Sequence, residues 1–214
     1  MSDNYPTPLW PSDFPVHPQH CADVVHGCYD VPLEIERHTI LDIGANIGAF
    51  ARWANDRWPD STIVCYEPHP QNFFYLERTV ASIPNPSIFC TQVAVLNRYG
   101  EFDLLPGKFN CGEWSLFGAP DVDKEKKIPV PVMDAKKLPR ADIMKIDTEG
   151  AEPFILRRLI ECGHIKYLSA IMLEYHREGE DKSIPEMLEP HGFKLHSHKT
   201  GISESRGELK FLKT

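Results

Sequence analysis

The sequence contains no stretch of about 20 apolar residues, the length that a membrane-spanning helix requires. Its N-terminus also lacks the basic segment followed by an apolar segment that is typical of a secretory signal peptide. Internal repeats and low-complexity tracts are absent as well. These absences exclude a membrane-spanning or fibrous protein at the sequence level, and we expect a cytoplasmic one.

Positive charge is scarce relative to negative charge. The chain has 23 lysine and arginine residues against 31 aspartate and glutamate residues, which gives a formal net charge of -8 at pH 7. Its densest basic run, at Lys124, Lys126 and Lys127, lies among acidic residues. Because this excess of negative charge would repel a phosphate backbone, we expect no nucleic acid as a partner.

Prolines are concentrated near the N-terminus. Residues 1–30 combine them with large aromatic side chains, and this composition disfavours a regular helix. The residues concerned are Pro6, Pro8, Pro11, Pro15 and Pro18 with Tyr5, Trp10 and Phe14. We therefore predict an extended Pro/aromatic-rich arm over residues 1–30 and a single folded domain over residues 31–214.

The apolar pattern changes at residue 39. Residues 39–43 predict a short strand, and the apolar residues after the following turn recur at helical spacing. Residues 62–67 predict a second strand, after which Pro70 opens a second helix. Two consecutive strand–helix units favour a parallel sheet and an α/β fold. Further predicted elements are strands over 88–95, 101–105, 128–132, 142–147 and 168–175, a short helix over 184–188 and a terminal hairpin over 193–196 and 208–212.

The turn after the first strand reads LDIGANIG at positions 41–48. Its glycines let the backbone approach a ligand closely, which predicts a nucleoside site at this edge of the sheet. A dinucleotide site prefers glycine where Asn46 stands, and its pyrophosphate would be repelled by Asp42. S-adenosylmethionine (SAM) presents an ammonium and a sulfonium instead, which Asp42 would attract. The sign of the charge favours SAM over NAD.

A second acidic residue, Glu67, ends the second predicted strand. Its two carboxylate oxygens suit the two hydroxyls of a ribose, and Tyr66 or Pro68 could flank the adenine. A dinucleotide would use the same carboxylate, so Glu67 alone does not distinguish the two cofactors. The predicted cofactor site comprises Asp42, Gly44, Ala45, Asn46, Gly48, Glu67 and Pro68.

The segment KIDTEGAE at positions 145–152 ends another strand in a group of ionisable side chains. Burying such a group is unfavourable unless its members face a cleft or one another. In an open α/β sheet, the ligand crevice lies at the carboxyl edge of the strands. Together with LDIGANIGAF at 41–50, YEP at 66–68 and WSL at 114–116, this segment resembles the FkbM family of SAM-dependent methyltransferases over residues 38–198. The family commonly has valine where Thr148 stands.

The resemblance implies a Rossmann-like, seven-stranded class I methyltransferase sheet that is mostly parallel, with helices on both faces and an antiparallel C-terminal hairpin. It implies SAM contacts at Asp42, Gly44, Asn46, Gly48 and Glu67 and O-methylation as the reaction. It implies no particular substrate. The N-terminal arm and the loop over residues 106–127 set this chain apart from the family, and loops of this kind are where we expect acceptor selectivity.

We expect the methyl acceptor to lie against the ends of two neighbouring strands. Asp147 and Glu149 follow one of them, and Glu174 and His176 end the next. Lys145 shares a strand face with Asp147 and would either orient the acceptor or form a structural ion pair. For an alcohol acceptor, His176 is the expected general base because an unperturbed imidazole titrates near neutrality.

The sequence does not favour a metal site, although a divalent metal is an alternative. The carboxylates of Asp147, Glu149 and Glu174 are hard oxygen ligands that could hold such an ion against a diol. The histidines and cysteines between positions 17 and 28 match no standard zinc spacing. We therefore predict SAM as the cofactor and no metal.

Three functions stay open at this stage. The first is SAM-dependent O-methylation of a hydroxyl on a small-molecule, sugar-containing or natural-product acceptor. The second is a SAM-binding regulatory module without turnover, and the third is a nucleotide-dependent oxidoreductase. A homodimer is compatible with all three.

Overall fold

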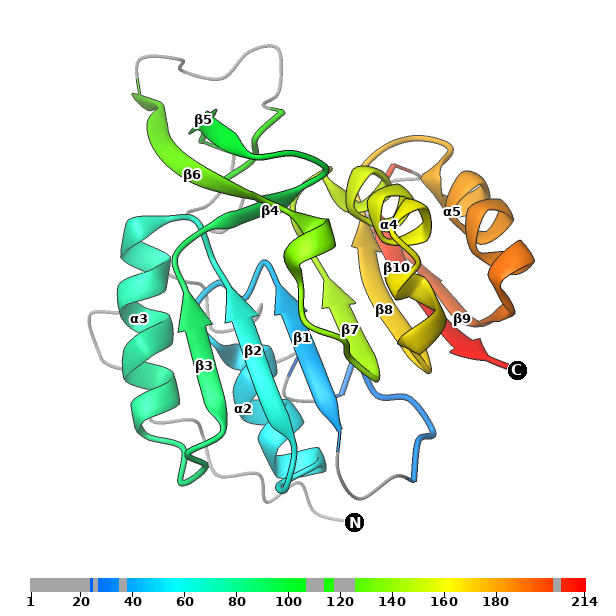
Figure 1. Cartoon of the computed structure of the whole chain (residues 1–214), viewed down its shortest axis with the longest axis horizontal. Coiled ribbons are helices and arrows are strands. Elements are labelled where there is room, and N and C mark those ends of the chain that lie inside the picture. Colours follow the sequence, from blue (N-terminus) through cyan, green and yellow to red (C-terminus); the bar gives the residue numbers. More distant parts are fainter. Residues whose placement is uncertain (1–23, 25–26, 35–37, 107–113, 118–125, 202–204) are drawn as a thin grey trace.

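The computed structural model describes residues 24, 27–34, 38–106, 114–117, 126–201 and 205–214 of the chain. Its centre is a seven-stranded sheet with the order β3-β2-β1-β7-β8-β10-β9 (Figure 1). The first five of these strands are parallel, whereas β10 runs antiparallel to both β8 and β9. The strands are β1 (Thr39–Ile43), β2 (Thr62–Tyr66), β3 (Ile88–Thr91), β7 (Ile143–Ile146), β8 (Ala170–Tyr175), β9 (Phe193–Thr200) and β10 (Gly207–Lys213). The predicted α/β fold with a C-terminal antiparallel hairpin is confirmed.

Helices cover both faces of this sheet because its strands are buried on both sides. Ile40 of β1 packs with Phe50 of α2 (Ala49–Arg57) and Leu76 of α3 (Pro70–Ala81). The next residue along β1, Leu41, points to the other face and packs with Ile155 of α4 (Glu152–Glu161). Helix α5 (Glu180–Leu188) lies on the α4 side and begins four residues before the predicted start at Ile184. Near-continuous apolar strands are typical of such a two-sided core.

A second, three-stranded sheet has the order β4-β6-β5, with β4 (Ala94–Leu96), β5 (Gly100–Leu104) and β6 (Ile128–Asp134). The prediction of one strand over 88–95 was wrong, because the chain turns between β3 and β4. Val93 N–H donates to the Thr91 carbonyl at 3.1 Å, and the chain then enters the second sheet. Short 3-10 turns occupy Ala135–Lys137, His164–Tyr167 and Glu189–His191.

Local sequence signals explain where the helices begin and end. Pro70 starts α3, where its fixed φ suits a first turn and its missing N–H is not needed. The ring Nδ1 of His69 accepts the Asn72 N–H at 3.4 Å and so caps the same helix. Gly163 follows α4 with φ 75°, the left-handed conformation expected just after a helix. The start of α3 thus follows directly on the carboxyl end of β2.

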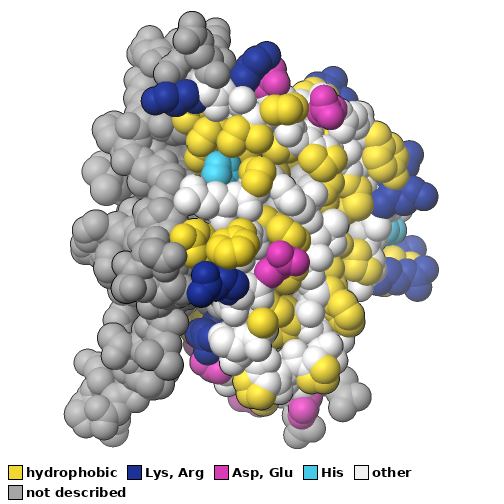
Figure 2. Space-filling model, turned by 90° about the vertical axis from the view of Figure 1, so that its left-hand side faces the viewer, with side chains coloured by type: hydrophobic (Ala, Val, Ile, Leu, Met, Phe, Trp, Pro, Cys, Tyr) yellow, Lys and Arg dark blue, Asp and Glu magenta, His cyan; other side chains and the backbone are white. Residues whose placement is uncertain are grey.

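The side formed by α3 and the edge strand β3 faces the viewer in Figure 2. On its described part, hydrophobic side chains stand between polar groups and a few charged ones. Phe74 of α3 and Phe89 of β3 are each more than half exposed. No described helix is both long and apolar enough to cross a membrane. No disulfide joins any two of the four described cysteines, Cys28, Cys65, Cys90 and Cys162.

Two predicted regions fall largely outside the described residues. Of the predicted arm, only residues 24 and 27–30 are described. Of the loop over 106–127, only residues 106, 114–117 and 126–127 are described. The division of the chain into an arm and a single domain stays a prediction.

Candidate active site

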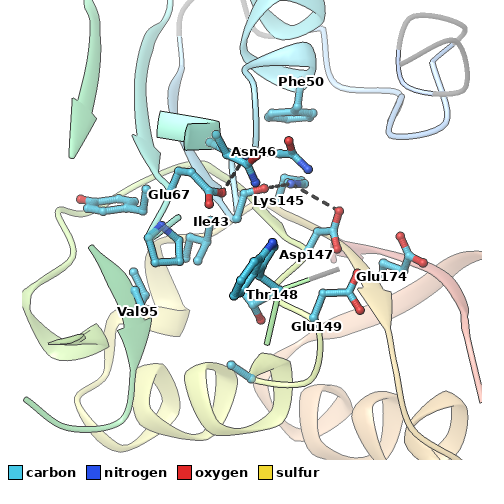
Figure 3. A pocket seen from close by; sticks show the side chains of 18 of the residues that line it. Ile43, Asn46, Phe50, Glu67, Val95, Lys145, Asp147, Thr148, Glu149 and Glu174 are labelled. Carbon is cyan, nitrogen blue, oxygen red and sulfur yellow. Dashed lines mark hydrogen bonds and ion pairs between the residues drawn. The ribbon is translucent and has the colours of Figure 1, made fainter. Parts of the chain in front are cut away.

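A cavity of about 300 Å³ lies at the carboxyl ends of β1, β2, β7 and β8. Figure 3 shows Glu67 at one end of it, Asp147, Glu149 and Glu174 together at the other, and Lys145 between them. The predicted cofactor residues that line the cavity are Gly44, Ala45, Asn46, Glu67 and Pro68, whereas Asp42 and Gly48 do not line it. The predicted acceptor residues that line it are Lys145, Asp147, Glu149 and Glu174, whereas His176 lies behind them. The ligand edge of the sheet therefore brings both predicted groups together.

The turn after β1 is held against the ends of two neighbouring strands. The N–H groups of Gly44 and Ala45 both donate to the Tyr66 carbonyl at 3.0 Å. A Cβ added to Gly44, whose φ is 78°, would lie 1.7 Å from the Asp147 carbonyl oxygen. Only glycine fits there. Asn46 has φ 50°, a left-handed conformation that asparagine tolerates better than most residues.

Glu67 is buried and receives hydrogen bonds from the backbone on both oxygens. Asn46 N–H donates to Oε2 and His69 N–H donates to Oε1, each at 2.8 Å. Burial raises the pKa of Glu67 to about 7, and the two N–H donors oppose that rise. Each oxygen keeps a further lone pair, so the carboxylate can still accept hydrogen bonds from a ribose.

Asp42 does not face the cavity, contrary to the expectation from the sequence. Its side chain is 0% exposed, and the Lys145 ammonium lies 3.3 Å from its Oδ1. Direct contact between Asp42 and a cofactor cation, as expected above, does not fit this geometry, because Lys145 lines the cavity and Asp42 does not. Burial raises the pKa of Asp42, and the positive charge of Lys145 opposes that rise.

Lys145 links the two ends of the cavity. Its Nζ donates to the Gly44 carbonyl at 2.6 Å and lies 3.7 Å from Asp147 Oδ2. Burial by itself would lower the pKa of this lysine, but the carboxylates of Asp42 and Asp147 outweigh burial and raise it. The ammonium is therefore charged at neutral pH and serves as counter-charge to both. Of the two roles predicted for Lys145, the ion pair is the one that the contacts show.

His176 is surrounded by carboxylates. Its Nε2 lies 3.7 Å from Asp147 Oδ1, 3.5 Å from Glu149 Oε2 and 3.6 Å from Glu174 Oε1. Burial would lower the pKa of His176, but a hydrogen bond to Glu152 and the surrounding negative charge raise it to about 10. The expectation that His176 is a neutral general base is therefore corrected. The sequence shows the spacing of these residues but not how many acids converge on one ring.

Glu152 is a site residue that the sequence analysis did not select. Its side chain is 0% exposed, and its Oε1 accepts hydrogen bonds from the N–H and the hydroxyl of Thr148 at 2.8 and 2.9 Å. The same oxygen lies 3.2 Å from His176 Nδ1. Glu152 belongs to the 145–152 segment, but nothing in the sequence shows that it would turn inward to the histidine.

Three further residues reach the acidic end of the cavity from distant parts of the chain. Tyr29 donates its hydroxyl to Asp147 Oδ2 at 3.4 Å, and an Arg206 nitrogen lies 3.2 Å from Glu149 Oε2. Ser115 donates its hydroxyl to the Glu149 carbonyl at 2.7 Å. The described end of the N-terminal arm and the described centre of the 106–127 loop therefore both touch the predicted acceptor site.

No protein-family model matches this chain. Methyltransferase 1 of Beauveria bassiana (strain ARSEF 2860) is 24% identical to it over 198 residues, which span 81% of this chain and 79% of the relative. Methyltransferase sdnD of Sordaria araneosa is 27% identical over 203 residues, which span 78% of each protein. Both alignments extend well beyond the short motifs described above.

Solved structures agree on the architecture. Methyltransferase FkbM from Methylobacillus flagellatus KT superposes with a TM-score of 0.58 at 14% identity, covering 84% of this chain and 45% of that one. The fold is that of a class I methyltransferase. Magnesium protoporphyrin IX methyltransferase from Synechocystis PCC 6803, solved with bound SAM, superposes with a TM-score of 0.51 at 8% identity, covering 92% of this chain and 77% of that one. Fold and curated relatives together support a methyltransferase that uses SAM.

Proposed function

We propose that this protein transfers the methyl group of SAM to a hydroxyl oxygen of a small-molecule acceptor, in the manner expected of the FkbM family. The observation that carries the proposal is a cavity with two chemically different ends. One end offers the glycine turn and Glu67 to a nucleoside, and the other offers carboxylates to a hydroxyl. A methyl donor and its acceptor must meet in one such space.

The donor end fits the nucleoside part of SAM. Glu67 offers its carboxylate to the ribose, and the backbone at Gly44 lies close enough to β7 that no side chain intervenes. Ile43, Pro68 and Val95 line the same part of the cavity and supply apolar contacts for a base. Because Asp42 is paired with Lys145, we expect it to support this wall rather than to touch the cofactor.

The acceptor end holds Asp147, Glu149 and Glu174, whose side chains are 28%, 17% and 33% exposed. They are exposed enough to accept hydrogen bonds from an incoming hydroxyl. An acceptor held this way would meet the methyl group from the side opposite sulfur, and such positioning supplies much of the rate in methyl transfer. This supports oxygen as the methylated atom and a hydroxyl-bearing small molecule as the acceptor.

The first test is calorimetric titration of the purified protein with SAM, with S-adenosylhomocysteine (SAH) and with NAD. We expect SAM and SAH to bind and NAD not to bind. A panel of hydroxylated acceptors, including sugars and polyketides, is then incubated with SAM carrying a radioactive methyl group. Methyl incorporation that is stable to base, as an ether is, would support O-methylation of an alcohol or phenol.

Other outcomes separate the rival functions. SAM binding without incorporation into any acceptor would favour a regulatory module without turnover. Binding of NAD in preference to SAM would favour the oxidoreductase and would overturn the proposal. A label on nitrogen, or one released by mild base as from a methyl ester, would keep the methyltransferase but contradict transfer to a hydroxyl.

A further inference from the structure

The acidic end of the cavity brings possible metal ligands together from two strands. Asp147 and Glu149 follow β7, and His176 follows β8. One ligand atom from each of these three residues lies within 4.8 Å of the other two. Carboxylates gathered at a strand edge are common without any bound ion, so a metal site here depends on the histidine.

His176 is buried and directed at the carboxylates. Its side chain is only 3% exposed, and its Nε2 forms no hydrogen bond within the described part of the chain. That nitrogen faces Asp147 and Glu149 at 3.7 and 3.5 Å, beyond good hydrogen-bond distance. A buried polar atom without a hydrogen bond is uncommon and points to a missing partner.

The other ring nitrogen fixes which tautomer faces the cavity. Glu152 Oε1, 3.2 Å from Nδ1, already accepts two hydrogen bonds from Thr148 and acts as an acceptor. Nδ1 therefore carries a hydrogen, and once a metal ion displaces the proton of Nε2 the ring presents the Nε2 lone pair to the space that it shares with Asp147 and Glu149. A carboxylate behind the ring is the arrangement that orients histidine ligands in metal sites.

The separations and charges suit a divalent cation. Two ligands each about 2.1 Å from one metal lie about 3.0–3.5 Å apart, slightly less than the distances observed between Nε2 and the two carboxylates. Four carboxylates gather here, those of Asp147, Glu149, Glu152 and Glu174. Apart from His176, whose Nε2 proton a metal ion would displace, the cationic partners are Arg206, at Glu149, and Lys145, which Asp147 shares with Asp42. A divalent ion would offset the remaining negative charge.

We propose that Asp147, Glu149 and His176 bind a divalent first-row metal ion at the acceptor end of the cavity. One imidazole nitrogen with two carboxylate oxygens favours Mn²⁺, Fe²⁺ or Zn²⁺ over Ca²⁺ or Mg²⁺, which prefer all-oxygen sites. Three protein ligands leave coordination positions open toward the cavity.

The open positions suggest the acceptor class. A hydroxyl or a pair of neighbouring hydroxyls, as in a catechol or a vicinal sugar diol, can occupy them as oxygen ligands. This role in holding the acceptor rests on the proposed methyltransferase function. Binding of the ion itself does not, so failure of one proposal is distinguishable from failure of the other.

The test titrates the chelator-stripped full chain with Mn²⁺, followed by electron paramagnetic resonance, and with Zn²⁺, followed by calorimetry. We expect one saturable site. Asp147→Asn and Glu149→Gln alter side chains at the cavity wall and should each weaken binding at least tenfold. Glu152→Gln, which changes only the support of the ring, should weaken it about 10- to 100-fold. Glu208→Gln is the matched control, because Glu208 lines the same cavity outside the three ligands, and it should leave binding unchanged.

His176→Ala removes the nitrogen ligand. Because Glu152 also loses a partner in this variant, the melting temperature of the variant is measured beside that of the wild type. A wild-type chain that binds neither Mn²⁺ nor Zn²⁺ overturns the proposal. So does binding that is equal in wild type, Asp147→Asn and Glu149→Gln. SAH titration of the stripped protein is run in parallel, and its result bears on the methyltransferase function alone.

Discussion

The two ends of the cavity are built by different physical means. The donor end is made of backbone: the turn after β1, the carbonyl of Tyr66 and two N–H groups directed at Glu67. The acceptor end is made of charged side chains that come from β7, β8 and the C-terminal region, together with the hydroxyl of Tyr29 from the N-terminal region. One end thus depends on close packing and the other on charge balance. The following predictions test that division.

The largest effect is expected from Gly44→Ala. The added Cβ would lie 1.7 Å from the Asp147 carbonyl oxygen, so the turn or β7 must move. We expect a loss of more than about 4 kcal/mol in the free energy of unfolding, together with loss of SAH binding. Gly163→Ala is the control, because Gly163 has a similar φ of 75° with no atom within 4 Å of the new Cβ. It should cost about 1–2 kcal/mol, from the left-handed backbone alone. The free energy of unfolding is measured in urea, and equal losses for Gly44→Ala and Gly163→Ala would contradict the packing explanation.

The next effect is expected from Lys145→Met. It leaves the buried carboxylate of Asp42 without a counter-charge, and breaking a buried pair from one side costs about 3–5 kcal/mol. Adding Asp42→Asn should restore part of the loss, since the uncompensated charge disappears. Lys127→Met, which breaks an exposed pair with Asp103, should cost about 1 kcal/mol or less. If Lys145→Met and Lys127→Met lose the same free energy of unfolding, charge balance does not stabilise this end of the cavity.

A smaller effect is expected from Glu67→Gln. The amide directs an N–H group toward one of the two backbone N–H donors, so that donor loses its acceptor and the ribose loses a carboxylate. We expect SAH affinity to fall about 10- to 100-fold, equivalent to about 1.4–2.7 kcal/mol. Calorimetry measures the change. Glu77→Gln, on the exposed side of α3, should bind SAH like the wild type. Unchanged affinity in the Glu67 variant would place the ribose elsewhere.

The smallest effect concerns pH. The pKa of Glu67 is raised to about 7, so this carboxyl is mostly protonated below that pH and binds a ribose less well there. Its charged neighbours are Asp42 on β1 and Lys145 on β7. SAH affinity should therefore fall about tenfold from pH 8 to pH 6, as the ionised fraction falls. The Glu67→Gln variant should lack this dependence. A fall of equal size in that variant would assign the titration to another group.

Local sequence predicted which residues meet at the proposed donor end. The strand, the glycine turn and the helix after it form one continuous stretch, and Glu67 ends the next strand, so spacing alone places Gly44, Asn46 and Glu67 at one edge. The acceptor end was predicted only in outline. Tyr29 meets Asp147 across 118 positions of the chain, and Arg206 meets Glu149 across 57. Pairings over such distances leave no periodic signal. The sequence therefore grouped His176 with the carboxylates of the two strand ends, but it showed neither the pairing of Asp42 with Lys145 nor the contact of His176 with Glu152.

The Asp42–Lys145 pair also bears on how the sheet assembles. The two residues stand directly opposite each other in the parallel pairing of β1 with β7. Slipping β7 by one residue would turn Lys145 to the opposite face, among the apolar side chains that pack against α4. The strands come from segments about a hundred positions apart in the chain, and most of their other side chains are interchangeable aliphatic ones. We expect this one pair of charges to select the correct alignment of the central strands during folding.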